Sequence, residues 1–251
     1  MMKPLAFVDL DDTLCMSKRR LGALGATPHC VAYLDPRGTP GGYCTPAQWG
    51  LYTWLKANTI MIPVTARRLH ALQRMQLTFD HEQVCCGGGL LLTVDGQIDE
   101  VWCGQMAEAL APYAAQLESL EAHWRQLGVD AGCRVRTRVV GHRGVPMYLC
   151  AKHMGRDAEL FGGLIDAHVE TLRPEGWHLY VHNYSAALSP PPLTKGHAVD
   201  YLKARHEAPF TLGVGDSAAD HPFLARCDVA MTPTDSDLFR HLTDAMTGST
   251  R

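Results

Sequence analysis

The sequence predicts an α/β protein with a doubly wound, mostly parallel (Rossmann-like) core that is interrupted by an inserted α+β domain. Short apolar runs alternate with helical segments in the first part of the chain, and this alternation resumes after the run Pro190-Pro191-Pro192. Between the two parts, the order helix–strand–strand–helix–strand indicates a separate α+β unit. We therefore predict a catalytic core domain formed by 1–98 and 187–251, and a cap domain formed by 99–186.

The bulk composition is that of an ordinary globular protein, with 251 residues, 46% hydrophobic residues and a net charge of −3. This charge provides no long-range attraction for nucleic acid or for an anionic membrane, so we expect neither as a partner. A small anionic substrate would need local cations or a metal ion to hold it. Nothing in the sequence bears on the oligomeric state.

The cysteines and the N-terminal segment indicate a cytoplasmic protein. The nine cysteines are odd in number and form no C-x-x-C pair, which favours a reducing compartment. Asp9 and Asp11 interrupt the first apolar run, so the N-terminus does not resemble a signal peptide. No apolar run approaches the length of a membrane span.

The core is expected to contain buried strands and amphipathic helices in alternation. Thr45-Pro46-Ala47-Gln48 predicts a helix start with a capping box, and that helix should extend to Asn58. Residues 18–44 are rich in Gly and Pro and predict a long loop or flap. Asp95-Gly96 lies between the apolar runs 90–94 and 97–102 and predicts a hairpin. The other expected core elements are strands at 5–8, 59–64, 83–86, 210–215 and 228–231, and helices at 67–77, 195–206, 218–226 and from about 235.

The cap should contain one long helix, a small sheet and a second helix. The expected elements are a helix at 106–127, strands at 133–140 and 146–152, a helix at 158–172 and a strand at 177–183.

Four acids and two other polar residues fall at the ends of core strands or at helix starts. Asp9 and Asp11 follow the first strand and are two residues apart, a spacing that points both side chains to one side of an extended segment. Two carboxylates so close repel each other unless a cation or a shared proton intervenes. In open α/β sheets, ligands bind outside the carboxyl ends of the strands. The remaining residues of this set are Thr65, Lys195, Asp216 and Asp220.

These residues resemble the four motifs of the haloacid dehalogenase superfamily. Residues 7–14 (FVDLDDTL) resemble the first motif, Thr65 the second, Lys195-Gly196 the third and 215–220 (GDSAAD) the fourth. The motifs occur in the family's order, which is the specific part of the resemblance. An α/β domain between the second and third motifs resembles the branch with a large cap. That branch includes sucrose-phosphate phosphatase, mannosyl-phosphoglycerate phosphatase and the phosphomannomutases.

The resemblance implies a phosphatase mechanism through an aspartyl-phosphate. Asp9 would attack phosphorus, and Asp11 would protonate the leaving alcohol and then activate water. The metal ion would be Mg²⁺, held by Asp9, the backbone carbonyl of Asp11 and Asp216. Thr65 and Lys195 would hold the phosphoryl oxygens.

Other residues are implied in supporting roles. Asp220 would orient Lys195 or a metal-bound water, and Ser217 would assist from the same motif. The candidates for binding the rest of the substrate are Arg67 in the core and, in the cap, Arg136, Arg143, Lys152, His182 and Asn183. The simpler interpretation of the cap residues is a solvated polar face of a sheet.

Some features depart from the family pattern. Asp12 replaces the glycine usual in this branch, and Ala66 and Ala219 replace residues that are often Gly and Asn. The triplet Gly87-Gly88-Gly89 predicts a turn and lacks the Lys and Ser that follow in a phosphate-binding P-loop.

The function expected from the sequence is therefore magnesium-dependent hydrolysis of a small, sugar-like phosphate monoester. One alternative is a phosphomutase of the same branch, which returns the phosphoryl group to a second hydroxyl. Another is a non-catalytic protein that binds a sugar or phosphate on this fold, although such a protein has no need of both Asp9 and Asp11.

Overall fold

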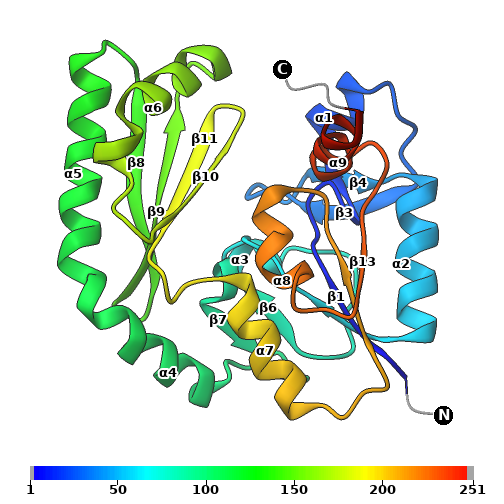
Figure 1. The fold of residues 1–251 in the computed structure, drawn as a ribbon. Coiled ribbons are helices and arrows are strands. Elements are labelled where there is room, and N and C mark those ends of the chain that lie inside the picture. The colour runs from blue at the N-terminus through cyan, green and yellow to red at the C-terminus, as the bar shows by residue number, and fades with distance from the viewer. Residues whose placement is uncertain (1–2, 248–251) are drawn as a thin grey trace. The chain divides into compact units, whose positions relative to one another are not determined.

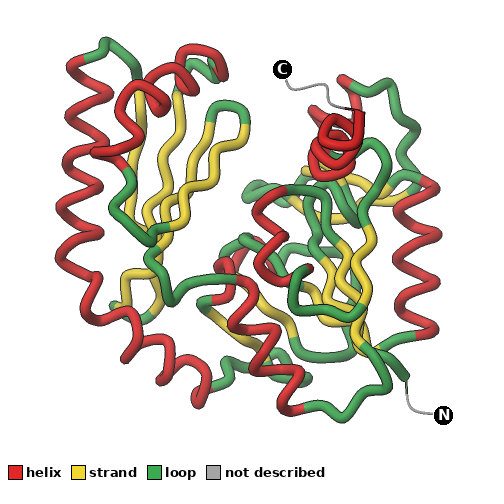
Figure 2. Tube along the Cα trace, viewed as in Figure 1, coloured by secondary structure: helices red, strands yellow, loops and turns green. Residues whose placement is uncertain are grey.

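The computed structural model describes residues 3–247 (Figure 1). The chain divides into two units: unit 1 is formed by the residues up to Glu100 together with those from Thr194 onward, and unit 2 by Val101–Leu193. Figure 2 shows helices and strands in both units. The predicted fold class, an α/β core with a parallel sheet and an inserted α+β unit, is confirmed.

A four-stranded parallel sheet forms the centre of unit 1. Its order is β13-β12-β1-β5, and every neighbouring pair is parallel. Every residue of β1 and β12 is buried, as expected for apolar strands that are covered on both faces. Figure 1 shows α2 on one side of this sheet and α7 and α8 on the other. The strands are β1 (Leu5–Val8), β5 (Ile60–Pro63), β12 (Thr211–Val214) and β13 (Val229–Met231), and the helices are α2 (Pro46–Asn58), α3 (Leu69–Leu72), α7 (Lys195–Arg205), α8 (His221–Leu224) and α9 (Asp237–Thr247).

The helix predicted after Thr45 begins as expected. The Thr45 hydroxyl accepts a hydrogen bond from the Gln48 backbone N–H at 3.2 Å, and the Gln48 side chain accepts one from the Thr45 N–H at 3.0 Å. The helix predicted at 67–77 is wrong for most of its length, because only Leu69–Leu72 is α-helical.

Of the two alternatives predicted for 18–44, a long loop or a flap, the loop is also wrong. Residues 16–44, called the flap below, form the helix α1 (Lys18–Ala23) and a three-stranded antiparallel sheet of order β2-β4-β3. The Asp35 carboxylate accepts hydrogen bonds from the N–H groups of Arg37 and Thr39 and so closes the hairpin turn. The strands are β2 (Met16–Ser17), β3 (Cys30–Leu34) and β4 (Pro40–Cys44). The Gly and Pro residues therefore belong to turns and close packing within a sheet.

A second hairpin follows the core helices. The strands β6 (Gln83–Cys85) and β7 (Leu90–Leu92) are antiparallel and are joined by the 3₁₀ turn η1 (Cys86–Gly88). The turn predicted at Asp95-Gly96 is present, since the Thr93 N–H donates to the Gln97 carbonyl at 2.8 Å. Its second arm is short, because the helix α4 (Glu100–Leu110) begins within the run predicted as a strand.

Unit 2 is an antiparallel sheet covered by helices. Its strand order is β10-β11-β9-β8, and α5 and α6 pack on one face around a core that includes Trp124, Phe161 and Trp177. The predicted helix 106–127 is interrupted by a 3₁₀ turn that contains Pro112, so α4 and α5 are separate helices. The elements are η2 (Ala111–Tyr113), α5 (Ala114–Asp130), β8 (Val135–His142), β9 (Val145–His153), α6 (Ala158–Leu172), β10 (His178–His182) and β11 (Ser185–Ser189).

The strand β11 has no counterpart among the predicted elements. It pairs with both β10 and β9, and it extends past the predicted domain boundary at 186. The small residues of β11 carry a weak strand signal, which explains why it was missed. Within residues 3–247, no helix is both long and apolar enough to span a membrane.

Candidate active site

Three polar residues of the predicted motifs lie at the ends of neighbouring strands, at one edge of the core sheet. Asp9 follows β1, Thr65 lies just beyond β5, and Asp216 lies just beyond β12. Because these strands are adjacent and parallel, their carboxyl ends meet at the same edge. All three residues are buried, although each carries a polar side chain.

Lys195 links two of the acids. Its ammonium donates to Asp9 Oδ1 at 2.5 Å and to Asp220 Oδ1 at 2.6 Å. It is the first residue of α7, where the Thr194 hydroxyl caps the helix by accepting from the His197 N–H. The next residue must be Gly196, since a Cβ there would lie 2.5 Å from the Pro222 carbonyl oxygen. Close packing of α7 against α8 thus sets where the ammonium lies.

Asp220 accepts several hydrogen bonds in addition to the one from Lys195. Its second oxygen, Oδ2, accepts from the Asp216 N–H, the Ser217 N–H and the Ser217 hydroxyl, each at 3.1 Å. The side chain is fully buried. The preceding Gly215 permits this approach, because a Cβ on it would lie 2.7 Å from the Asp220 Cβ. Asp220 therefore orients both the lysine and the loop that carries Asp216.

The cluster contains more negative than positive charge. One carboxylate oxygen from each of Asp9, Asp216 and Asp220 lies within 4.8 Å of the others. Burial, and after it the charge of Asp220, raises the pKa of Asp216 to about 8. Burial also raises the pKa of Asp9 well above its ordinary value, although the Lys195 ammonium opposes this change. Burial disfavours that ammonium, but the carboxylates of Asp220 and Asp9 outweigh it and raise the pKa of Lys195.

This donor set fits a hard divalent cation. Asp220 already accepts four hydrogen bonds, so Asp9 and Asp216 are the acids with oxygen atoms left for a metal ion. The Thr13 hydroxyl donates to Asp216 at 3.5 Å, a long contact that leaves this carboxylate weakly satisfied. Carboxylate oxygens are the ligands that Mg²⁺ prefers in proteins.

Asp11 does not share the surroundings of Asp9. Its side chain is 51% exposed, and Arg67 binds its carboxylate with two hydrogen bonds, from Nε at 2.8 Å and from Nη2 at 2.6 Å. The predicted substrate ligand Arg67 is therefore a partner of Asp11. The following residue, Asp12, has a positive φ of 62°, a backbone conformation that glycine adopts without strain. Asp12 also pairs with Arg20 at 3.1 Å.

Thr65 is held by backbone contacts on both sides. Its N–H donates to the Val84 carbonyl at 3.0 Å, and its hydroxyl accepts from the Arg67 N–H at 3.1 Å. This hydroxyl is thus beside the backbone of the residue that binds Asp11.

In unit 2, four polar residues form one row across the sheet. Arg136 opposes Lys152, Lys152 opposes Ser185, and Ser185 opposes His182 in the strand register. Directly opposed residues share a face, and the alternate residues of these strands pack toward α5 and α6. The row therefore lies on the face that these helices leave open. Asn183 continues it in the adjoining turn, where its amide nitrogen lies 2.6 Å from His182 Nε2.

Arg143 is separated from this row. It lies in the turn between β8 and β9 with a φ of 47°, seven residues along the chain from Arg136. At about 3.3 Å per residue, the two positions are at opposite ends of the sheet.

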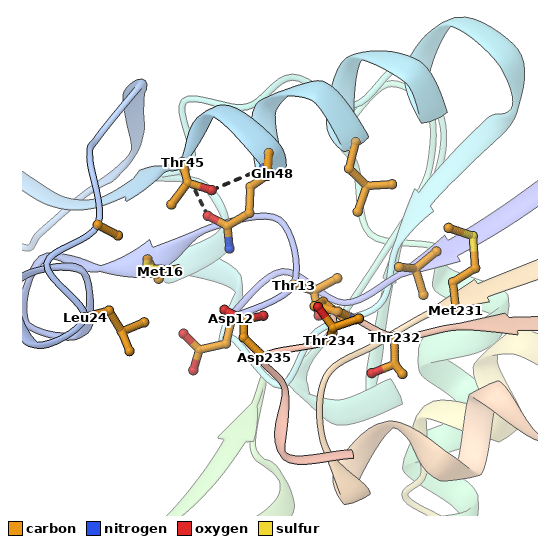
Figure 3. Close-up of a pocket in the computed structure, with 15 residues that line it drawn as sticks. Asp12, Thr13, Met16, Leu24, Thr45, Gln48, Met231, Thr232, Thr234 and Asp235 are labelled. Atoms are coloured by element: carbon orange, nitrogen blue, oxygen red, sulfur yellow. Dashed lines mark hydrogen bonds between the residues drawn. The ribbon is translucent and has the colours of Figure 1, made fainter. Parts of the chain in front are cut away.

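A cavity of about 630 Å³ lies beside Asp12 and Thr13 (Figure 3). Its lining comes from the flap, from the start of α2 and from the loop after β13, and it includes Asp12, Thr13 and Asp235. Asp9, Asp11, Thr65 and Lys195 are not among the residues that line it. Two acids and neither lysine nor arginine line it, which does not suit a phosphate group.

Sequence reasoning missed several supporting residues. The contact of Thr13 with Asp216, and the packing of Tyr33 on Arg67 with the guanidinium carbon 3.9 Å from the ring centroid, join segments distant in sequence. Thr13 lies within the quoted first motif, which was a signal available in the sequence. Tyr33 lies in the segment taken for a loop and carried no signal.

Comparison with known proteins gives a structural likeness only. No protein-family model matches the chain, and no curated protein sequence matches it. Solved structures do match. The sucrose-phosphatase from Synechocystis sp. PCC6803, in complex with sucrose and phosphate, has a TM-score of 0.57 at 15% identity over 97% of this chain and 88% of that chain.

Two further structures share the fold. A trehalose-6-phosphate phosphatase related protein has a TM-score of 0.52 at 20% identity over 91% of this chain and 85% of that chain. The C-terminal domain of C. albicans trehalose-6-phosphate phosphatase has a TM-score of 0.54 at 11% identity over 100% of this chain and 78% of that chain. The fold expected from the four motifs is therefore confirmed.

The excess of buried carboxylates predicts a dependence of stability on pH and metal. A carboxyl whose pKa is raised on folding stabilises the protein fully below its unfolded pKa of about 4, and this contribution is lost as the pH rises through its folded pKa, here about 8 for Asp216. In chelator, Asp216→Asn should therefore raise the melting temperature at pH 8, with little effect at pH 5. Added Mg²⁺ should raise it at pH 8 for the unmodified protein and much less for the variant.

Differential scanning calorimetry at both pH values, with chelator or Mg²⁺, measures these four differences. Asp228→Asn is the control, because that carboxylate is exposed outside the cluster and its pKa is lowered by hydrogen bonds from Thr211. If Mg²⁺ raised the melting temperature of Asp216→Asn as much as that of the unmodified protein, Asp216 would be excluded as a metal ligand.

Proposed function

We propose that this protein is a magnesium-dependent phosphatase that hydrolyses a small, sugar-like phosphate monoester through a phosphorylated Asp9. The observation that carries the proposal is the buried Asp9 carboxylate at the end of the central strand, bound to Lys195 and surrounded by Asp216 and Asp220. A buried acid with a bound cation and a second acid two residues later suits phosphoryl transfer to a carboxylate.

The fold supports this class of reaction. The solved structures that share it include a sucrose-phosphatase and a trehalose-6-phosphate phosphatase domain. Both of these proteins are named for sugar phosphates, which favours a polar, hydroxyl-rich leaving group for this chain. Fold alone does not determine function, so the proposal depends on the residues of the site.

Asp9 is the proposed nucleophile. One of its oxygens forms a bond to phosphorus while the bond between phosphorus and the leaving oxygen breaks. Lys195 lies 2.5 Å from Asp9 and can neutralise a phosphoryl oxygen at the same place, with the Thr65 hydroxyl as a further donor. Asp9, the Asp11 backbone carbonyl and Asp216 would hold Mg²⁺, which neutralises charge on the phosphoryl oxygens when it is bound.

Asp11 is the proposed general acid and base. It gives a proton to the departing alkoxide, and it then takes a proton from the water whose oxygen attacks the aspartyl-phosphate. This second step releases phosphate and restores Asp9. The exposure of Asp11 suits proton exchange with solvent, whereas Asp9 is shielded. Two neighbouring carboxylates thus take different roles because their surroundings differ.

Asp220 and Ser217 support these groups without touching the substrate. Asp220 holds Lys195 in place, and its bonds to the backbone of Asp216 and Ser217 fix the loop that carries the metal ligand. Such partners of a ligand tune its orientation and basicity.

We also propose that unit 2 determines which leaving group is accepted. Its open sheet face carries Arg136, Lys152 and His182 in one row, with Asn183 beside it. These side chains can bind hydroxyl groups or a further anionic group. Arg143, in the turn between β8 and β9, is a further candidate for the same role.

A screen of phosphate release tests the function directly. Small sugar phosphates should release phosphate in the presence of Mg²⁺, and excess chelator should abolish the release until Mg²⁺ is restored. A phosphomutase would require a bisphosphate activator for turnover, and a binding protein would bind sugar phosphate without releasing phosphate. Full activity in chelator would contradict the metal requirement.

Asp9 and Asp11 should fail in different ways when they are replaced. Asp9→Asn should abolish both covalent phosphorylation and turnover. Asp11→Asn should still bind metal and substrate but lose about 10²–10⁴-fold in rate on alkyl phosphates. The loss in the first step should be smaller for 4-nitrophenyl phosphate, whose leaving group needs no proton.

Rapid-quench labelling with a phosphate donor measures both variants. Phosphate trapped on the Asp9→Asn protein would show that the nucleophile is another residue. A normal rate for Asp11→Asn on alkyl phosphates would place the acid–base role elsewhere.

The proposed role of unit 2 predicts a change in the Michaelis constant. Arg136→Ala and Lys152→Ala should each raise KM for a sugar phosphate by about tenfold, which is the loss of affinity expected when one hydrogen bond to a charged group is removed. Arg125→Ala is a matched control, because Arg125 lies on α5 and pairs with Glu121 on the same helix. If all three variants have the KM of the unmodified protein, the row is only a solvated sheet face.

A further inference from the structure

We propose that Tyr33, in the flap, is a positioning residue that acts on Asp11 through Arg67. The inference rests on the proposed acid–base role of Asp11. It assigns a function to the flap, whose sheet brings Tyr33 to Arg67, the partner of Asp11.

The first observation is a continuous chain of contacts from the flap to Asp11. The Arg67 guanidinium carbon lies 3.9 Å from the centroid of the Tyr33 ring. The same guanidinium donates to both oxygens of Asp11, at 2.8 Å and 2.6 Å. The Arg67 side chain is only 11% exposed, so this long cation is held between the ring and the carboxylate.

The second observation is that the flap provides a close-fitting support for the ring. A Cβ on Gly42 would lie 2.1 Å from Tyr33 Cε1, and one on Gly41 would lie 2.7 Å from Tyr33 Cε2. The ring therefore packs directly on the backbone of β4, where any larger residue would displace it. This packing accounts for two adjacent glycines inside a strand, a position that glycine otherwise weakens.

The third observation is the irregular register around Tyr33. The β3–β4 pairing shifts on both sides of this residue, and Tyr33 also bridges Met75. Bulges redirect a side chain locally and are common beside active sites. Here the bulge is the point at which the ring leaves the regular sheet and meets Arg67.

The mechanical consequence concerns the geometry of Asp11. Half of the Asp11 side chain is exposed, and the two hydrogen bonds from Arg67 hold its carboxylate. Proton transfer to a leaving oxygen requires the acid within hydrogen-bond reach, and a small displacement is costly. A guanidinium stacked on an aromatic ring binds a carboxylate in one planar geometry. Tyr33 thus restricts Arg67, and Arg67 restricts Asp11.

The test compares two leaving groups that differ in their need for a proton. Single-turnover phosphorylation is measured by rapid quench with an alkyl phosphate and with 4-nitrophenyl phosphate. Tyr33→Leu should slow the phosphorylation of Asp9 by the alkyl phosphate about 10–100-fold. It should change the rate with 4-nitrophenyl phosphate little. Tyr33→Phe keeps the ring but loses the hydroxyl, which also forms a hydrogen bond with Arg67, so its loss with the alkyl phosphate should be smaller than that of Tyr33→Leu.

Gly42→Ala displaces the ring from its other side and should reproduce the selective loss seen with Tyr33→Leu. Gly50→Ala is the matched control, because a Cβ at Gly50 meets no atom within 4 Å, and it should retain both rates. Melting temperatures of all variants separate loss of folding from loss of positioning.

Several outcomes would overturn the inference while leaving the phosphatase intact. These are equal losses on both esters, no loss for Tyr33→Leu, or a Tyr33→Phe variant as slow as Tyr33→Leu. If the unmodified protein releases phosphate from neither ester, the proposed function fails and the inference fails with it.

Discussion

The rest of the site depends on the ion pairs that one buried ammonium, that of Lys195, forms with two carboxylates. It contacts Asp9 near the start of the chain and Asp220 near its end, and both carboxylates are buried. Without this cation, three neighbouring carboxylates would repel one another in a medium of low dielectric constant. The close packing at Gly196 and the capped start of α7 serve to bring the ammonium to this position. The remaining negative charge is what makes the cluster suitable for a metal ion.

The two acids of the first motif illustrate how surroundings distinguish identical side chains. The spacing of Asp9 and Asp11 predicts that they point to one side of the chain, and the structure adds a different cation to each. Lys195 belongs to the buried cluster, whereas Arg67 belongs to the more exposed edge beside the flap. The Lys195 ammonium opposes the protonation of Asp9 that burial favours, whereas the exposed Asp11 carboxylate can exchange protons with solvent.

The sequence predicts those parts of the molecule that depend on local patterns. The apolar runs of β1, β5 and β12, the capping box at Thr45 and the four motifs all follow from short-range signals. The flap sheet and β11 could not be predicted, because their strands are short, rich in small residues and stabilised by pairing with distant partners. The contact of Tyr33 with Arg67 is of the same kind, since it joins an unpredicted strand to the loop after β5.

The position of unit 2 within the chain determines the order in which the molecule is made. β1 pairs with β12, so Leu5 meets Thr211 only after about 200 intervening residues have been synthesised. All strands of unit 2 end by Ser189, before α7 and β12 leave the ribosome. A newly made chain therefore contains every residue of the unit 2 sheet before it contains the lysine that pairs with Asp9. Domains that are local in sequence fold early, and pairing between distant strands is slow. The cluster around Asp9 consequently cannot form until Lys195 and Asp220 have been synthesised.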